Sequence, residues 1–502
     1  GRRRIYPDTF QAMMSSNLPF LILAGLLPFT ANADSPWTVE AVPFGKAVDQ
    51  QIGGIDVLPD GRVFVCFHEG EVRLYNPETR VWSIFAKGLH EPLGVHAESE
   101  SSIVVVQRPE ITRIQDTDGD GKADRFQTIS DQFGMSGNYH EFAFGPIQDP
   151  DGNWVVALNV ASNGAGIREE IRGTFLDVGL PREDFYVDDW KTVKNAAGRM
   201  YARVEWRGCI VTINNKTGEV TPFAYGFRSP NGIGFDAEGR LYASDNQGDW
   251  RGTSPLYHVE KGKFYGHPAS IPYMPDYDGP PPLEIPLEEL ETMRTPAAIW
   301  FPHGTMANSP TEPILIPEGF GPFAGQMLIG EMNRPRIVRL ILEEVNGVVQ
   351  GACVPFIDDM GLASGVNRLA FGPKDTLWTG HSHLSWAGGE GMSKITYHSE
   401  TSQQDVLTLT LQPDGFEATF VEPVKGIEGI ELASFTYLYQ PEYGSPRIDE
   451  EKEPFTAEKI NDKTIRIRLD EPLKNDFCYE FLFPEAVNPM VAYTVREIPA
   501  AK

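Results

Sequence analysis

Cysteine is scarce in this sequence. Its 502 residues include four cysteines, Cys66, Cys209, Cys353 and Cys478, which lie far apart along the chain. None of them forms a C-x-x-C pair or the C-x-x-C-H sequence that attaches a haem, so these two kinds of site are excluded. Because such spacing defines no disulfide pairing, we expect four buried apolar thiols.

Basic residues are also few. Lysine and arginine together number 43, against 70 aspartate and glutamate residues, which gives a formal net charge of −27. Binding to nucleic acid requires a basic face that displaces counterions, so no nucleic-acid partner is expected. We interpret the charge as one that keeps a secreted protein in solution, rather than one that steers a cationic partner.

The sequence near the N-terminus has an apolar run that is too short for a membrane helix. Residues 18–27 form a run of ten, about half the number that a transmembrane helix needs. The run leads to Ala31-Asn32-Ala33, a small-x-small pattern typical of signal-peptide cleavage. We therefore expect export to a secreted or periplasmic location, no membrane span, and no contribution of residues 1–33 to the fold.

Helical periodicity is nearly absent apart from one short candidate helix at 286–294. Instead, the sequence contains 49 glycines and 40 prolines, and it repeats a pattern of an apolar strand, a turn and a second strand. Six copies of this pattern occur, at Gly54–Val65, Leu93–Val106, Phe142–Val156, Gly232–Ala243, Pro313–Gly330 and Leu369–Trp378. Repeats of this kind predict an all-β fold in which residues 34–398 form a six-bladed β-propeller.

The pattern changes after His398. Residues 399–405 form a polar linker, and residues 406–502 contain alternating strands such as Val406–Leu411 and Thr464–Leu469. Their number and length are typical of an immunoglobulin-like β-sandwich. We interpret this second unit as an accessory domain.

Repeat symmetry predicts where a ligand site would lie. In a propeller, the residues just before the innermost strand of each blade converge on the mouth of the central channel. Aligning the repeats brings His140, Asn231 and Asn367 to equivalent positions, flanked by Arg228 and Arg368. Polar residues at such positions indicate a ligand site, although asparagine before a strand also often bonds its own backbone.

The histidines suggest further chemistry. His140 could act as a general base near neutral pH, or it could be a structural histidine. Glu141 follows it directly, so in a strand the two side chains would point to opposite faces. His303 lies in a turn-rich loop, and His381 with His383 could bind a metal if a third ligand were near.

The most specific local motif is the acidic loop at 116–124. Its carboxylates at positions 1, 3, 5 and 9, with glycine at position 6, fit the spacing of a calcium loop. Position 12 is Gln127 rather than a bidentate glutamate, and helices are not expected to flank the loop, so we expect a structural calcium site or else a solvated acidic turn. The expected ligands are Asp116, Asp118, Asp120, Asp124 and the carbonyl of Lys122.

Three motifs in order carry a resemblance to a known family. They are Tyr225–Phe235, Ala243–Gly248 and Gly262–Pro268. Over about residues 40–398 the chain resembles the soluble quinoprotein glucose/sorbosone dehydrogenase superfamily. It is also similar to secreted propeller proteins of planctomycete-type bacteria that are named as membrane-bound or sugar dehydrogenases.

The resemblance implies a pyrroloquinoline quinone (PQQ) cofactor and a calcium ion that bridges it to the protein. It implies that Arg228 touches the quinone, that Gln247 and Gly248 offer main-chain oxygens to the calcium, and that His140 takes the proton of a sugar hydroxyl. An external cytochrome c would accept the electrons. The expected cofactor contacts are Arg228, Asn231, Gln247, Gly248, Asp249, Asn367 and Arg368, and the expected substrate contacts are Glu141 and His303.

Three functions therefore remain open. The first is a sugar dehydrogenase in which hydride passes from a sugar hydroxyl to PQQ. The second is a non-redox lyase or hydrolase that acts on carbohydrate through His140. The third is a carbohydrate-binding scaffold without turnover.

Overall fold

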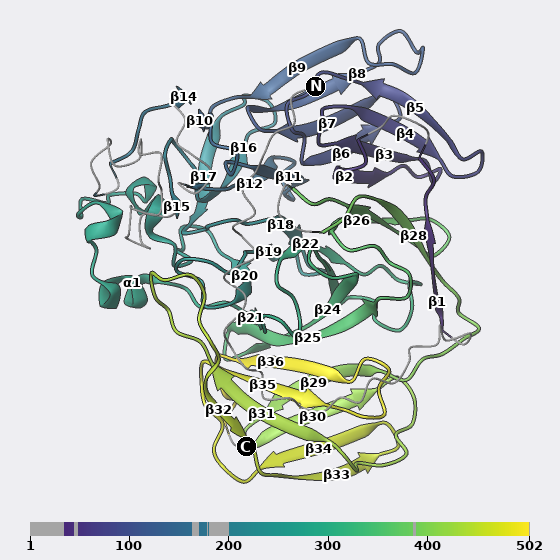
Figure 1. Cartoon of the computed structure of the whole chain (residues 1–502), viewed down its shortest axis with the longest axis vertical. Coiled ribbons are helices and arrows are strands. Elements are labelled where there is room, and N and C mark those ends of the chain that lie inside the picture. Colours follow the sequence, from purple (N-terminus) through teal and green to yellow (C-terminus); the bar gives the residue numbers. More distant parts are fainter. Residues whose placement is uncertain are drawn as a thin grey trace, which may run out of the picture. The chain divides into compact units, whose positions relative to one another are not determined.

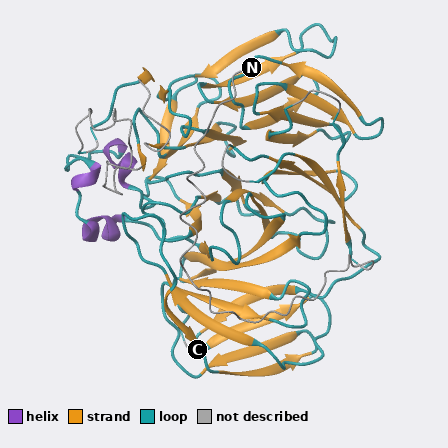
Figure 2. Cartoon of the chain, in the orientation of Figure 1, coloured by secondary structure: helices purple, strands orange, loops and turns teal. Residues whose placement is uncertain are grey.

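The structure is a computed structural model that describes residues 35–44, 49–162, 170–177, 179, 200–384 and 388–500. The expected signal sequence lies outside the described residues. Strands and loops make up most of the described chain, as Figure 2 shows, so the all-β prediction is confirmed. Among the described residues, no helix has the length and apolar character that crossing a membrane requires.

Residues 37–397 build five four-stranded antiparallel sheets and four strands of an eight-stranded sheet, which makes six sets of four strands (Figure 1). The first sheet contains β2 (Ile52–Val57), β3 (Val63–Phe67), β4 (Val72–Asn76) and β5 (Val81–Ala86). The second contains β6 (Gly94–Ser99), β7 (Ser102–Gln107), β8 (Glu110–Gln115) and β9 (Arg125–Ser130). The third contains β11 (Ala143–Gln148), β12 (Trp154–Leu158), β16 (Cys209–Ile213) and β17 (Val220–Tyr225).

The later sheets follow the same order. The fourth contains β18 (Gly232–Phe235), β19 (Leu241–Ser244), β20 (Ser254–Val259) and β21 (Ile299–Phe301). The fifth set is β22 (Pro310–Leu315), β23 (Met327–Glu331), β24 (Arg336–Val345) and β25 (Val348–Asp358), which continues into a larger sheet. The sixth contains β26 (Val366–Gly372), β27 (Thr376–His381) and β28 (Gly391–Tyr397), joined by β1 (Trp37–Ala41).

The second strand of each sheet is buried along its whole length. Every residue of β3, β7 and β12 is buried, whereas β9 is mostly exposed. A strand that is covered on both faces has a continuous apolar sequence, as in Ile103-Val-Val-Val106, rather than alternating apolar and polar residues. The sheets therefore bury their faces against one another.

The first strands form a closed cycle of contacts. β2 contacts β6, β6 contacts β11, and the series continues through β18, β22 and β26 back to β2. The strands approach so closely that glycine is required. A Cβ on Gly94 would lie 1.2 Å from the carbonyl oxygen of Gly145 in the next sheet.

The N-terminal strand completes the last sheet, which the sequence analysis did not predict. β1 pairs antiparallel with β28, from Trp37 opposite Tyr397 to Ala41 opposite Ser393. The indole ring of Trp37 packs on Phe320, Phe356 and Tyr397. The sheet thus joins the two ends of the 37–397 region.

The C-terminal strands form two further layers. One sheet contains β29 (Val406–Gln412), β30 (Gly415–Phe420), β33 (Phe455–Asn461) and β34 (Thr464–Leu469). The other contains β31 (Glu431–Thr436), β32 (Ile448–Lys452), β35 (Phe477–Leu482) and β36 (Met490–Val495), and β36 pairs with β25. Phe416, Phe481 and Tyr493 belong to the apolar core between these layers, together with Ala352 and Val354 of β25.

The remaining elements are short. They are β10 (Met135–Ser136), β13 (Ala161–Ser162), β14 (Glu170–Arg172), β15 (Met200–Tyr201), the 3-10 helices η5 (Pro268–Tyr273) and η6 (Pro282–Glu284), and helix α1 (Leu287–Met293). Helix α1 confirms the helix expected at 286–294. Glu288 and Glu289 lie in its first turn, where negative charge favours a helix, and Leu290 is buried.

All four cysteines are buried and free, which confirms the expectation of apolar thiols. Burial raises the pKa of the Cys66 thiol to about 12, so this side chain stays protonated at neutral pH. We expect none of the four to act as a nucleophile.

We expect Gly94→Ala to destabilise the fold, because the added methyl group would overlap the Gly145 carbonyl oxygen. Overpacking of a well-packed interior costs about 1–3 kcal/mol, and backbone rather than a mobile side chain meets the methyl here. Urea unfolding followed by circular dichroism measures the loss. Ser99→Ala, at the exposed end of the same strand, is the matched control and should change stability by less than about 0.5 kcal/mol. Equal stability of both variants would contradict the close packing of the first strands.

Candidate functional site

An arginine lies where the first strands of the six sheets meet. Arg368 Nη2 donates to the carbonyl oxygen of Leu93 at 3.0 Å, and Nη1 donates to those of Asn231 at 3.1 Å and Asn367 at 2.6 Å. Its Nε lies 3.6 Å from Glu312 Oε2. The guanidinium therefore fills the axis and ties the sixth sheet to the second, fourth and fifth.

Asn231 and Asn367 meet beside this arginine, while His140 has other partners. Asn231 Nδ2 lies 3.3 Å from Asn367 Oδ1, and Asn367 Nδ2 donates to the carbonyl oxygen of Ile52 at 2.9 Å. Both asparagines are buried. Their side chains thus crosslink the ring together with Arg368.

His140 lies just before β11 and is half-buried. Its Nδ1 is 2.8 Å from the carbonyl oxygen of Val160. A carbonyl oxygen only accepts, so Nδ1 carries the proton and Nε2 keeps a lone pair. Val160 N donates in turn to the carbonyl oxygen of Arg228 at 3.1 Å. Val160 therefore contacts both His140 and the backbone of Arg228.

The charge state of His140 follows from its surroundings. Burial and the positive charge of Arg228 lower its pKa to about 4. The imidazole is therefore neutral at pH 7. A neutral ring with an available Nε2 lone pair can accept a proton from a bound ligand.

Glu141 follows His140 directly after a turn and before β11 begins, so the two residues do not lie in a strand as the sequence analysis had considered. Its side chain is fully buried, and Oε2 accepts a hydrogen bond from Ser136 N at 2.7 Å. Arg207 Nη1 donates to the main-chain oxygen of Glu141 at 2.9 Å. The structure therefore shows Glu141 bracing the segment that carries His140.

The other histidines of the sequence analysis have surroundings of their own. His381 is fully buried, and its ring is 3.0 Å from the hydroxyls of both Thr379 and Ser393. Burial and the charge of Arg334 lower the pKa of His303. In the described part of the chain, the one group of three metal-ligating side chains is Asp116, Asp118 and Asp120, so His381 and His383 form no such group.

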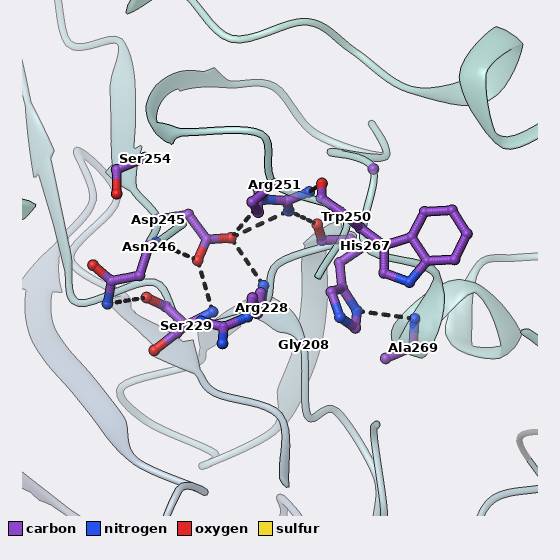
Figure 3. Close-up of polar contacts among 12 residues, drawn as sticks. Gly208, Arg228, Ser229, Asp245, Asn246, Trp250, Arg251, Ser254, His267 and Ala269 are labelled. Carbon is purple, nitrogen blue, oxygen red and sulfur yellow. Dashed lines mark hydrogen bonds and ion pairs between the residues drawn. The ribbon is translucent and has the colours of Figure 1, made fainter. Parts of the chain in front are cut away.

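Asp245 holds the turn that carries Arg228. Its Oδ2 accepts from Arg228 N at 2.9 Å and its Oδ1 accepts from Ser229 N at 2.7 Å (Figure 3). Arg251 Nε donates to Asp245 Oδ2 at 3.2 Å. All of these side chains are buried, so the carboxylate fixes the backbone through charge-assisted hydrogen bonds.

Asp249 binds the side chain of Arg228. Arg228 Nε donates to Asp249 Oδ1 at 2.9 Å, and His267 Nε2 lies 3.2 Å from Oδ2. Ala269 N donates to His267 Nδ1, which assigns the proton to Nε2. Burial acts to raise the pKa of Asp249, but the hydrogen bond from His267 and the charge of Arg228 outweigh it and hold this pKa well below its usual range.

Asp245, Arg251 and His267 were missed as functional residues by the sequence reasoning. Asp245 and His267 lie inside two of the three ordered motifs, at 243–248 and 262–268, and Arg251 follows three residues after the first of these. Buried carboxylates and a buried histidine in consecutive motifs could have indicated one network. Which of them pair could not be read from the sequence.

A loop of the C-terminal sheets covers the place implied for calcium and quinone. Gly248 O accepts hydrogen bonds from Gly444 N at 2.8 Å and from Arg251 N at 3.1 Å. The guanidinium of Arg228 lies 5.5 Å from the centre of the Tyr443 ring, and Asp249 pairs with Tyr443 in an isolated bridge.

These contacts test whether the residues fit a quinone held by calcium. The Gly248 carbonyl is engaged by protein N–H groups, and Arg228 is neutralised by Asp249 and covered by Tyr443. The residues therefore do not fit the cofactor in the manner that the resemblance implies.

The acidic loop lies on another part of the chain, between β8 and β9. The carboxylate oxygens of Asp116, Asp118 and Asp120 lie within 4.8 Å of one another. Asp124 accepts hydrogen bonds from Thr117, at 3.0 Å from its backbone N–H and at 2.7 Å from its hydroxyl. Lys122 N donates to Asp120 Oδ1 at 2.8 Å. Three of the expected ligand side chains thus converge.

Comparison with known proteins adds one family match. Residues 185–361 match the family model described as glucose/sorbosone dehydrogenase. No curated protein matches the chain.

Solved structures that the chain matches include sugar dehydrogenases. The PQQ-bound aldose sugar dehydrogenase of Streptomyces coelicolor is 14% identical, with a TM-score of 0.46 over 72% of this chain and 98% of that chain. The PQQ domain of pyranose dehydrogenase from Coprinopsis cinerea is 12% identical, with a TM-score of 0.47 over 72% of this chain and 95% of that chain. The resemblance to the glucose/sorbosone dehydrogenase superfamily that the three ordered motifs indicated is confirmed by the family match over residues 185–361.

Proposed function

We propose that residues 34–398 form a six-bladed β-propeller and that residues 406–502 form an immunoglobulin-like accessory sandwich after the linker 399–405. The closed cycle of contacts among β2, β6, β11, β18, β22 and β26 supports the first part. The core between the two C-terminal sheets supports the second. The pairing of β25 with β36 implies that the two units are held together along one sheet.

We propose that the protein acts on a sugar or sugar derivative and that His140 accepts a proton from a bound hydroxyl group. The observation that carries this proposal is the neutral His140 ring, whose Nδ1 is fixed by Val160 and whose Nε2 keeps its lone pair. His140 also follows Tyr139, whose ring is 41% exposed and lies 5.8 Å from the imidazole. Arg108 fixes this segment through the carbonyl oxygens of Asn138 and Tyr139.

Aromatic side chains favour a sugar as the ligand. Tyr443, on the face of Arg228, is 51% exposed. Half-exposed tyrosines present an apolar ring face and a polar hydroxyl, which suit the C–H faces and hydroxyl groups of a sugar.

Two reactions could follow from proton transfer to His140. A non-redox elimination or hydrolysis needs no hydride acceptor, and it is the reaction that the residues favour, because Gly248 and Arg228 are engaged by the protein itself. Oxidation by PQQ is the second candidate, favoured by the family match and by the presence of Arg228 and His140. An external cytochrome c would be required for that second reaction alone.

We further propose that the 116–124 loop binds one structural calcium ion, and that the protein is exported to the periplasm or secreted. Convergence of the Asp116, Asp118 and Asp120 carboxylates supports calcium, which prefers several oxygen ligands. Export is supported by the sequence of residues 18–33.

His140→Ala should abolish turnover of any sugar that the protein converts, because no proton acceptor remains. The wild-type value of kcat/KM should be constant from pH 5 to 8 and fall about tenfold for each pH unit below about 4, as His140 becomes protonated. Release of reducing ends and reduction of a dye, measured over a panel of sugars, report the two reaction types. His398→Ala, which removes an exposed side-chain hydrogen bond to Thr38, is the matched control. Full activity of His140→Ala would show that another residue accepts the proton.

The purified chain should show no saturable binding of PQQ in the presence of calcium. The reason is that Gly444 N already donates to the Gly248 carbonyl oxygen, and that Asp249 already forms an ion pair with the Arg228 guanidinium. Quenching of protein fluorescence during titration with PQQ measures binding, with a known quinoprotein as the positive control. Saturable, calcium-dependent quenching would contradict this prediction and would favour PQQ-dependent sugar oxidation as the reaction.

Calcium should bind the 116–124 loop with a stoichiometry of one. Isothermal titration of the chelator-treated protein measures it, and Asp118→Ala should weaken binding at least about tenfold by removing one oxygen ligand. Glu400→Gln, at an exposed carboxylate outside the loop, should leave the affinity unchanged. An equal calcium affinity of the wild type and Asp118→Ala would show that the loop is a solvated acidic turn.

A further inference from the structure

A cavity of about 310 Å³ lies at the end of the ring opposite to His140. Its walls come from the later parts of β2, β11, β18, β22 and β26 and from the first three residues of β6, whereas His140 and Asn231 precede their strands. Arg368 lies at its inner end and fills the axis between the two places. The cavity is therefore separate from the candidate site, and a ligand bound in it would be independent of the proposed function.

Apolar and polar side chains share the wall of this cavity. Half-buried Ile147, Phe235, Ile314 and Phe371 line it from four different sheets. A volume of this size, with apolar side chains and a few oriented polar groups on its wall, suits a small organic ligand.

Two carboxylates line this cavity, one from the first sheet and one from the fifth. Asp56 of the first sheet accepts hydrogen bonds from Val57 N at 2.8 Å and Ala97 N at 2.7 Å. His96 Nδ1 lies 3.6 Å from Asp56 Oδ2. Glu312 of the fifth sheet accepts from Leu369 N at 2.9 Å. Each carboxylate is thus oriented by backbone N–H groups.

Arg368 neutralises this pair only in part. Its nearest approach to Glu312 is 3.6 Å, and its N–H groups point to the carbonyl oxygens of Leu93, Asn231 and Asn367. Burial raises the pKa of Asp56 and of Glu312, and the charge of Asp56 adds to the shift of Glu312. Each carboxylate is therefore short of compensating positive charge, and a cation between them would supply it.

We propose that this cavity is a binding site for a small organic ammonium ion, with its charged group held by Asp56 and Glu312 and its alkyl part against Phe235 and Phe371. A bare metal ion fits less well. Asp56, Glu312 and His96 do not form one of the metal-ligating groups found in the described residues, and the surrounding wall offers no further oxygen-rich side chains. An ammonium ion needs one or two carboxylates and gains from the apolar surface.

The test is isothermal titration of the full chain at pH 8, because a high pH favours the ionised form of both carboxyl groups. The probes are n-butylammonium chloride and, as its neutral counterpart, 1-butanol. We expect saturable binding of one n-butylammonium ion per chain and no saturable binding of 1-butanol. Asp56→Asn and Glu312→Gln, each of which removes one negative charge, should weaken n-butylammonium binding at least tenfold.

Matched controls separate a lost site from a lost fold. Glu78→Gln removes an exposed carboxylate outside the cavity and should leave the affinity unchanged. The midpoint of thermal unfolding is measured for every variant; if Glu312→Gln does not fold because Arg368 loses its partner, Asp56→Asn decides the outcome. The proposal is overturned if n-butylammonium does not bind the wild type, if 1-butanol binds equally well, or if the folded Asp56→Asn variant binds within twofold of the wild type.

Discussion

The guanidinium of Arg368 is held at the meeting point of six strands by the carbonyl oxygens of Leu93, Asn231 and Asn367 and by the nearby carboxylate of Glu312. A buried charge is costly unless it is paired and hydrogen-bonded, so this arrangement constrains the position of each strand that offers a partner. It also divides the axis. One end then carries His140 and the asparagines, and the other carries the cavity with Asp56 and Glu312.

A second buried network lies beside His140. Asp245 fixes the turn at Arg228 and Ser229, while Asp249 pairs with the Arg228 side chain and contacts His267. Burial and the charge of Arg228 favour the neutral form of His140, while the charge of Asp249 acts in the opposite direction. The ion pair with Asp249 engages Arg228 within the protein, so this network disfavours an anionic quinone at this place.

The C-terminal sheets contribute to this end of the ring. Tyr443 lies over Arg228, Gly444 N binds the Gly248 carbonyl, and β36 extends the sheet of β25. The interpretation of residues 406–502 as an accessory domain rested on their lack of concentrated chemistry. Backbone hydrogen bonds carry most of the contact with residues 248–252, and such contacts leave no signature in side-chain composition.

The sequence by itself determined the all-β class, the six strand–turn–strand units, helix α1 and the resemblance to glucose/sorbosone dehydrogenases, because apolar runs, turn residues and ordered motifs are local features. It also singled out His140, Asn231, Asn367, Arg228 and Arg368 through the spacing of repeats. Tertiary structure alone decided that β1 completes the sixth sheet, that Arg368 fills the axis, that Asp249 pairs with Arg228 and that Gly444 binds Gly248. The physical reason is that these are hydrogen bonds between segments from about 20 to more than 350 residues apart, and only the folded backbone determines which donor reaches which acceptor.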